Sequence, residues 1–223
     1  MKLVWSPETA SKAYIDTVKQ ARGGQNPGDA EFLAAMAAGY NVKLIVEVRR
    51  SLNAGGGGIG TSVGLAVAAG HTGGRHVCVV ADEAARREYI SAMQEADVAL
   101  PEIVVVGEAE RVVEGLEAVD FLVVQGRSGG GEIFRRAKLS RRGAVLVYKG
   151  GSKTATAAAS SRFCWGGTVD GSNLRIVKSV SLPLENGLEI AYVGVNDGKT
   201  LKSPKRWIRR IDLQSGEEHV FRR

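Results

Sequence analysis

The sequence of 223 residues is poor in the side chains that build disulfide frameworks and metal clusters, with two cysteines and three histidines. Two cysteines far apart support neither kind of site, and Cys78, within an apolar strand pattern, is expected to be a buried, inert thiol. No apolar run approaches the roughly 20 residues that cross a bilayer, and the N-terminus lacks a signal-peptide pattern. We expect a cytoplasmic protein, with the nucleus also open, and no membrane partner.

The overall composition is ordinary, but the charge is unevenly placed. The hydrophobic content of 44% and charged content of 24% are typical of soluble globular proteins, and the length suits one domain with a sizeable core. The formal net charge is +6, and the excess cations gather at 135–142 and 199–210. Such clusters can bind nucleic acid, although most are solvated surface, so nucleic acid is the less favoured partner.

Residues 43–83 show the most informative pattern of the chain. An apolar strand pattern at 43–48 is followed by a glycine run, a helical pattern at 61–70, a second strand pattern at 76–81 and then Asp82. The glycines of the run are Gly55, Gly56, Gly57, Gly58 and Gly60. This order is typical of a nucleotide-binding βαβ unit, in which glycines allow close backbone approach and the acid bonds a ribose hydroxyl.

The rest of the chain extends this alternation and then leaves it. Continuous apolar runs at 102–106, 120–124 and 143–148 alternate with helical patterns, as in a parallel sheet covered on both faces. After residue 174, two strand patterns flank P183-L-E-N-G187, a strong hairpin signal. The sequence therefore predicts an α/β fold: a doubly wound, mainly parallel, seven-stranded sheet with an antiparallel C-terminal hairpin. A further hairpin is predicted at 207–222.

Two helices are predicted before the first strand. The first spans 6–22, with Ser6 as its cap, and the second ends at Gly39, with Asp29 as its cap.

Three motifs resemble those of the class I S-adenosylmethionine-dependent methyltransferases, most closely the small caffeoyl-CoA and catechol O-methyltransferases. They are E31-F-L with the following first strand, V106-G-E-A109, and L182-P-L-E-N-G-L. The similarity covers about 29–195, and the whole sequence resembles a plant family of uncharacterised methyltransferase-like proteins. The resemblance implies one domain, with an N-terminal helical segment (1–28), a Rossmann-like core (29–195) and a basic extension (196–223).

The same resemblance implies S-adenosylmethionine as cofactor, bound by the glycine run and by five other residues. Glu47 would bond the amides of the glycine loop, and Asp82 would hold the ribose, unless it serves as a helix N-cap. Glu108 and Ala109 would lie near the adenine, with an ordinary exposed loop acid as the alternative for Glu108. Gln125 follows the fourth strand and completes the set. The insertion R49-R-S-L-N-A54 departs from the family, and the loop could close the pocket differently or obstruct it.

No metal is expected, because the segments that carry metal-binding carboxylates in the metal-dependent relatives read V124-Q-G-R-S and Y148-K-G-G here. Lys149 is a candidate catalytic base or anion clamp, with a solvated lysine as the alternative. Arg127 is a candidate clamp for an anionic substrate, unless it faces solvent.

Three functions fit these observations. The first is metal-independent methyl transfer to an unidentified small molecule, with a homodimer left open. The second is a catalytically silent relative that binds a protein, small molecule or nucleic acid, which the missing carboxylates and the altered glycine loop favour. The third, a nicotinamide-dependent oxidoreductase, fits the closing hairpin least well.

Overall fold

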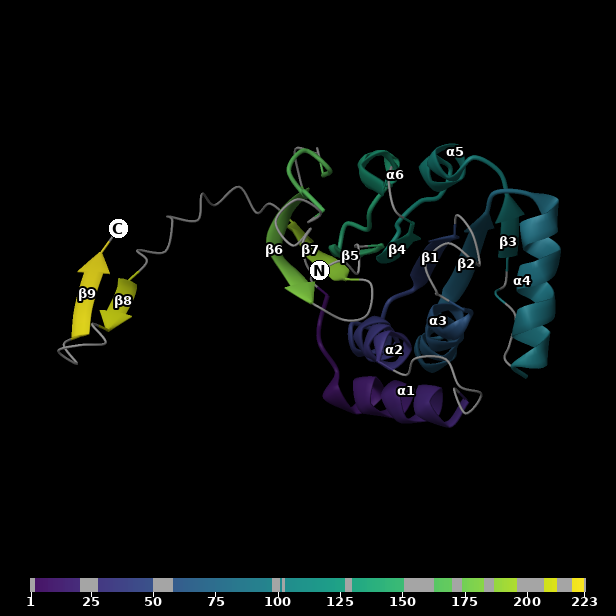
Figure 1. Ribbon diagram of the computed structural model, residues 1–223, viewed down its shortest axis with the longest axis horizontal. Coiled ribbons are helices and arrows are strands. Elements are labelled where there is room, and N and C mark those ends of the chain that lie inside the picture. The colour runs from purple at the N-terminus through teal and green to yellow at the C-terminus, as the bar shows by residue number, and fades with distance from the viewer. Residues whose placement is uncertain are drawn as a thin grey trace, which may run out of the picture.

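Seven strands form one mixed sheet in the computed structural model, which describes residues 3–20, 28–49, 58–97, 101, 103–126, 130–150, 163–169, 174–182, 187–195, 207–211 and 218–222. The strands are β1 (Leu44–Arg49), β2 (Arg75–Val80), β3 (Ile103–Val106), β4 (Phe121–Gln125), β5 (Ala144–Lys149), β6 (Leu174–Leu182) and β7 (Leu188–Val195). Their order is β3-β2-β1-β4-β5-β7-β6. The first five pair in parallel, whereas β7 is antiparallel to both β5 and β6. The predicted sheet is therefore confirmed (Figure 1).

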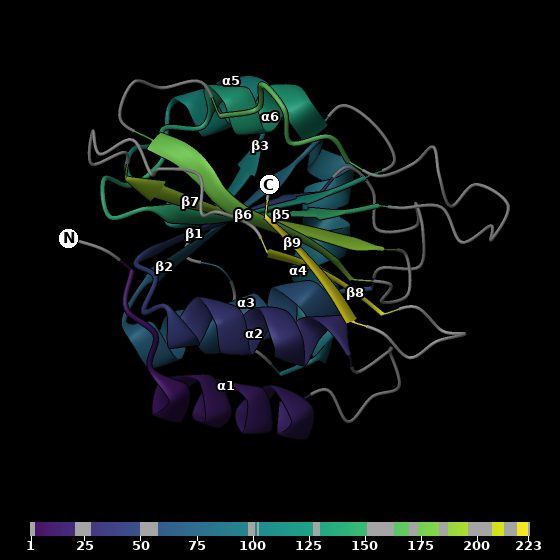
Figure 2. The same ribbon diagram turned by 90° about the vertical axis from the view of Figure 1, so that its left-hand side faces the viewer.

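Helices cover both faces of this sheet, as a doubly wound fold requires (Figure 2). They are α1 (Pro7–Gln20), α2 (Asp29–Gly39), α3 (Gly60–Thr72), α4 (Glu83–Glu95), α5 (Ala109–Glu114) and α6 (Gly130–Arg136). The helices α1, α2 and α3 lie on one face, and α5 and α6 lie on the other. One apolar cluster joins α2 and α3 to the sheet, a second joins α5 and α6 to the opposite face, and a third lies between α3, α4 and β2.

All six residues of β1 are buried, and four of them, Leu44, Ile45, Val46 and Val48, are apolar. A mainly apolar strand loses least by lying between two neighbouring strands under helices on each side, and the two charged residues of β1, Glu47 and Arg49, pair with each other. Small residues let the covering helices approach closely. A Cβ atom placed on Gly64 of α3 would lie 2.4 Å from the backbone oxygen of Ala30 in α2.

Element boundaries agree with the sequence-based ones to within a few residues, with one informative error. Gly28, rather than Asp29, occupies the N-cap position of α2 and makes no side-chain cap bond. The predicted cap is wrong because Asp29 begins the helix itself and turns its buried side chain toward Lys149. The predicted cap of α1 is confirmed, since the backbone N–H of Thr9 donates to Ser6 Oγ at 3.4 Å. The last hairpin is also confirmed, as β8 (Trp207–Ile211) pairs antiparallel with β9 (Glu218–Arg222).

The basic cluster at 135–142, the first of the two in the sequence, is largely neutralised by ion pairs with neighbouring acids. Arg136 pairs with Glu132 at 2.8 Å, and Lys138 pairs with Glu117 at 2.6 Å. Arg142 pairs with the buried Asp120. This pairing fits an ordinary solvated surface better than a free cationic patch. The side chains of the second cluster lie outside the described residues. None of the helices described is long and apolar enough to span a bilayer.

Candidate functional site at the carboxyl ends of the strands

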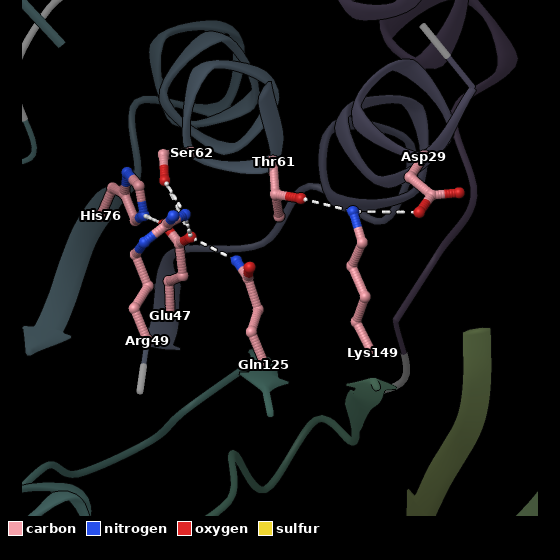
Figure 3. Close-up of polar contacts among 8 residues, drawn as sticks. All are labelled: Asp29, Glu47, Arg49, Thr61, Ser62, His76, Gln125 and Lys149. Atoms are coloured by element: carbon pink, nitrogen blue, oxygen red, sulfur yellow. Dashed lines mark hydrogen bonds and ion pairs between the residues drawn. The ribbon is translucent and has the colours of Figure 1, made fainter. Parts of the chain in front are cut away.

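Three polar residues end adjacent strands of the sheet in register. Arg49 ends β1 opposite Gln125 at the end of β4, and Gln125 is opposite Lys149 at the end of β5. Residues in register across a parallel sheet point to the same face, so the three side chains lie side by side. The first turn of α3 lies on this face, and its residues Thr61 and Ser62 point toward the strand ends (Figure 3). The carboxyl edge is also where open α/β sheets bind their ligands.

The carboxylate of Glu47 is the centre of a buried polar network at this edge. Its Oε1 accepts hydrogen bonds from Arg49 Nη1 at 3.0 Å, Ser62 Oγ at 2.8 Å and Gln125 Nε2 at 2.6 Å. Its Oε2 lies 3.2 Å from His76 Nε2. These contacts tie β1 to β2, to β4 and to the first turn of α3, so one carboxylate fixes four elements relative to one another (Figure 3).

The electrostatics of this network hold Glu47 in its ionised form. Burial alone would raise the pKa of the carboxyl group, but the hydrogen bond from His76 and the charges of Arg49 and His76 outweigh it. The net effect lowers the pKa of Glu47 to about 2. The carboxylate therefore serves as a fixed negative charge and not as a proton acceptor near neutral pH. Burial and this negative charge also raise the pKa of Tyr89, whose ring centroid lies 5.6 Å from Arg49 Cζ.

A second polar group links β5 to the first turns of two helices. The Nζ of Lys149 lies 3.0 Å from Asp29 Oδ2 and donates to Thr61 Oγ1 at 3.2 Å. Lys149 is only 8% exposed and Asp29 only 2%. The alternative of a solvated lysine is therefore wrong: the strand end lies beneath α2 and α3, where an ammonium group needs partners. Asp29 Oδ1 accepts no hydrogen bond from the residues described.

The predicted glycine loop is described only at its end. Gly58 precedes α3 and Gly60 is its first residue, whereas Gly55, Gly56 and Gly57 lie outside the described residues, as does Arg127. The expected bonds from Glu47 to the amides of this loop remain a prediction for the same reason. In the described residues, the carboxylate of Glu47 accepts hydrogen bonds from side chains, and one of the donors is Gln125, which the sequence analysis placed in the cofactor site.

Asp82, Glu108 and Ala109 follow the ends of β2 and β3 at the same edge. Asp82 is the N-cap of α4, where its Oδ1 accepts from the backbone N–H of Ala85 at 2.8 Å. Glu108 is exposed and pairs with Arg111 at 2.8 Å, and Ala109 begins α5. The structure therefore shows the alternative role that the sequence offered for each acid: Asp82 caps a helix, and Glu108 is an exposed acid. The roles of Asp82 at the ribose and of Glu108 and Ala109 at the adenine remain predictions.

Sequence reasoning missed Arg49, Ser62 and Asp29 as members of the site. For Arg49 a signal existed, because it lies two residues after Glu47, and residues two apart on a strand share a face. For Asp29 no local signal exists, since its partner Lys149 is far away in sequence.

A family model described as "Protein of unknown function (DUF1442)" matches residues 1–223. The chain belongs to the DUF1442 family. No protein of curated function matches it. Among solved structures, this DUF1442 chain is similar to cofactor-bound Rv0187 from MTB, with 19% identity, a TM-score of 0.54, and coverage of 86% of this chain and 92% of that one.

Two further structures are similar to the same extent. One is the O-methyltransferase TomG from Streptomyces achromogenes in complex with SAM, with 22% identity, a TM-score of 0.52, and coverage of 86% and 92% of the two chains. The other is the O-methyltransferase from Bacillus cereus in complex with SAH, with 17% identity, a TM-score of 0.53, and coverage of 86% and 93%. At these identities the likeness shows the fold: a class I methyltransferase fold.

Proposed function

We propose that the protein binds S-adenosylmethionine at the carboxyl edge of its sheet and transfers the methyl group to a small molecule without a metal ion. The observation that carries this proposal is the sheet order β3-β2-β1-β4-β5-β7-β6 with a glycine-rich segment between β1 and α3. That segment leads from the carboxyl edge directly into the first turn of α3, whose N-cap residue, Ile59, makes no side-chain cap bond. Uncapped amides at a helix N-terminus favour a ligand carboxylate.

The residues at this edge fit such a cofactor. When bound, S-adenosylmethionine supplies an electrophilic methyl group on a sulfonium. Asp82 is exposed, and only its Oδ1 is engaged by the cap, so Oδ2 can accept from a ribose hydroxyl. Glu108 follows the neighbouring β3 and is also exposed, which suits a contact with the adenine amine.

The ends of β4 and β5 support the metal-independent form of the proposal. Their terminal residues are Gln125 and Lys149, an amide and a cation in place of the carboxylates that a hard divalent cation prefers. Within the described ranges, no three His, Cys, Asp or Glu side chains lie together as a metal-binding group. Binding and turnover are therefore expected to be unchanged by a chelator such as EDTA.

Calorimetric titration with S-adenosylmethionine tests the proposal through Asp82. Asp82→Ser keeps a good N-cap but shortens the side chain, so stability is expected to change little while affinity falls about tenfold or more. Glu83→Gln, at the next residue of the same helix, is the matched control and should bind like wild type. Equal affinity in Asp82→Ser and wild type would contradict the ribose role.

A catalytically silent relative is the second candidate, and one observation favours it. Arg49 places a guanidinium group against Glu47 at the start of the inserted segment, where it can restrict access to the edge. A well-folded protein that binds neither S-adenosylmethionine nor its demethylated product would support this candidate.

A further inference from the structure

The N-terminal helix α1 exposes an apolar stripe on the side that faces away from the sheet. Tyr14 is 49% exposed, Ile15 52% and Val18 44%, and residues at this spacing lie on one side of a helix. Of the eight exposed large hydrophobic residues in the described part of the chain, five lie within 4–18. We propose that a second copy of this chain covers the stripe, with the two α1 helices packed antiparallel about a two-fold axis.

The opposite side of α1 is already packed. Its buried residues are Ala10, Ala13 and Thr17, which recur at helical spacing on the side that meets α2 and α3. The helix α1 is the outermost layer on its face of the sheet (Figure 1). One side of α1 therefore belongs to the core of its own subunit, and the apolar stripe on the other side contacts solvent.

The charged residues of α1 are self-complementary. They are Glu8, Lys12, Asp16 and Lys19, all of them exposed, and their signs alternate along the helix. Reversing the helix reverses this order, so two antiparallel copies place opposite charges together along their whole length. A two-fold axis level with Tyr14 brings Lys12 opposite Asp16 of the partner subunit. It also brings Glu8 within one residue, about 1.5 Å along the axis, of Lys19 of the partner subunit.

A two-fold contact requires exactly such a surface, because the same patch meets itself. A parallel pair of α1 helices would instead place like charges side by side. The charge balance also argues against a membrane or a nucleic acid as the occupant. Helices that bind those partners carry an excess of Lys and Arg on the polar face, whereas α1 carries two acids and two lysines.

The expected contact is small. A single pair of 14-residue helices buries less than the roughly 1,600 Å² of a typical specific complex. We therefore expect a reversible dimer that dissociates at low protein concentration. The apolar stripe supplies most of the affinity, and the charges select the antiparallel orientation.

Sedimentation velocity of the full chain over a wide range of concentrations tests the inference. The wild type should pass from monomer to dimer as its concentration rises. The double variant Ile15→Gln, Val18→Gln should raise the dissociation constant about tenfold or more. Gln favours a helix more than Ile or Val does, so loss of α1 does not explain a weaker dimer. Val177→Gln, at an exposed apolar residue of β6, is the matched control and should associate like wild type.

Two charge reversals test the antiparallel orientation. Lys12→Glu and Asp16→Lys each place like charges together in the proposed contact, so each variant alone should associate more weakly than wild type. An equal mixture of the two restores opposite charges at every position and should associate like wild type. Lys12→Glu also removes the pair with Glu8, and Asp16→Lys removes contacts with Lys19 and His71. These losses within a subunit persist in the mixture, so they do not produce the recovery.

Recovery in the mixture identifies the antiparallel α1 contact, and circular dichroism of each variant checks that it is folded. The inference is overturned if the wild type is monomeric at every concentration, in which case a different partner covers the stripe. It is also overturned if the Ile15→Gln, Val18→Gln variant associates like wild type, or if the mixture associates no more tightly than its two components.

Discussion

Glu47→Gln is expected to destabilise the protein strongly near neutral pH, and the effect should fade in acid. Folding lowers the pKa of this carboxyl group from 4.5 to about 2, which corresponds to about 3 kcal/mol of stability at neutral pH. The substitution also leaves the guanidinium of Arg49, which is 3% exposed, without its carboxylate. Breaking a buried ion pair on one side costs about 3 to 5 kcal/mol, and we expect a loss in that range.

The sign of the pH dependence follows from the direction of the shift. A carboxyl group whose pKa is depressed by folding stabilises the protein above its unfolded pKa, and this contribution is lost as the pH falls from about 4.5 to about 2. Urea denaturation of wild type and Glu47→Gln should therefore show a large difference near neutral pH and a smaller one near pH 3. Glu132→Gln, at an exposed carboxylate paired with Arg136, is the control and should show little effect. Equal stability of wild type and Glu47→Gln at neutral pH would refute the reasoning.

Two further predictions concern packing and thiol reactivity. Gly64→Ala places a Cβ 2.4 Å from the Ala30 backbone oxygen and should cost about 1 to 3 kcal/mol in urea denaturation. Gly70→Ala in the same helix meets nothing within 4 Å and should be neutral or stabilising; equal effects would contradict the close helix contact. Cys164 is exposed, whereas Cys78 is buried and burial raises its pKa. A thiol reagent should label one cysteine in the native protein and two after denaturation, and two in the native protein would contradict the core packing.

The fold was predictable because its strong signals are local. The apolar runs that became β1, β4 and β5 can be buried only between helical layers, and the Asn-Gly turn before Leu188 marks the closing hairpin. The burial of Cys78 followed from the same alternation and is confirmed. Errors are confined to element ends, such as the cap of α2, where Gly28 and Asp29 are both acceptable N-cap residues.

The candidate site was less predictable because its contacts join residues distant in sequence. Lys149 and Asp29 meet only once β5 is placed under α2, and no spacing rule connects them. Asp82 was ambiguous for a different reason: an Asp directly after a strand suits both a helix N-cap and a ribose contact. One residue satisfies both patterns, so the sequence cannot separate them.

The two polar networks act on the same structural element from opposite sides. Glu47 bonds Ser62 and Lys149 bonds Thr61, so the first turn of α3 is held by both β1 and β5. The amides of this turn are the groups that would meet a cofactor carboxylate, and fixed donors bind without a reorganisation cost. Glu47 and Lys149 therefore hold the start of α3 in place whether or not they touch a ligand. Arg49, which ends β1, adds to this rigidity because its Nη1 donates to Ser62 Oγ at 3.1 Å; the rest of the segment 49–54, which departs from the family pattern, lies outside the described residues.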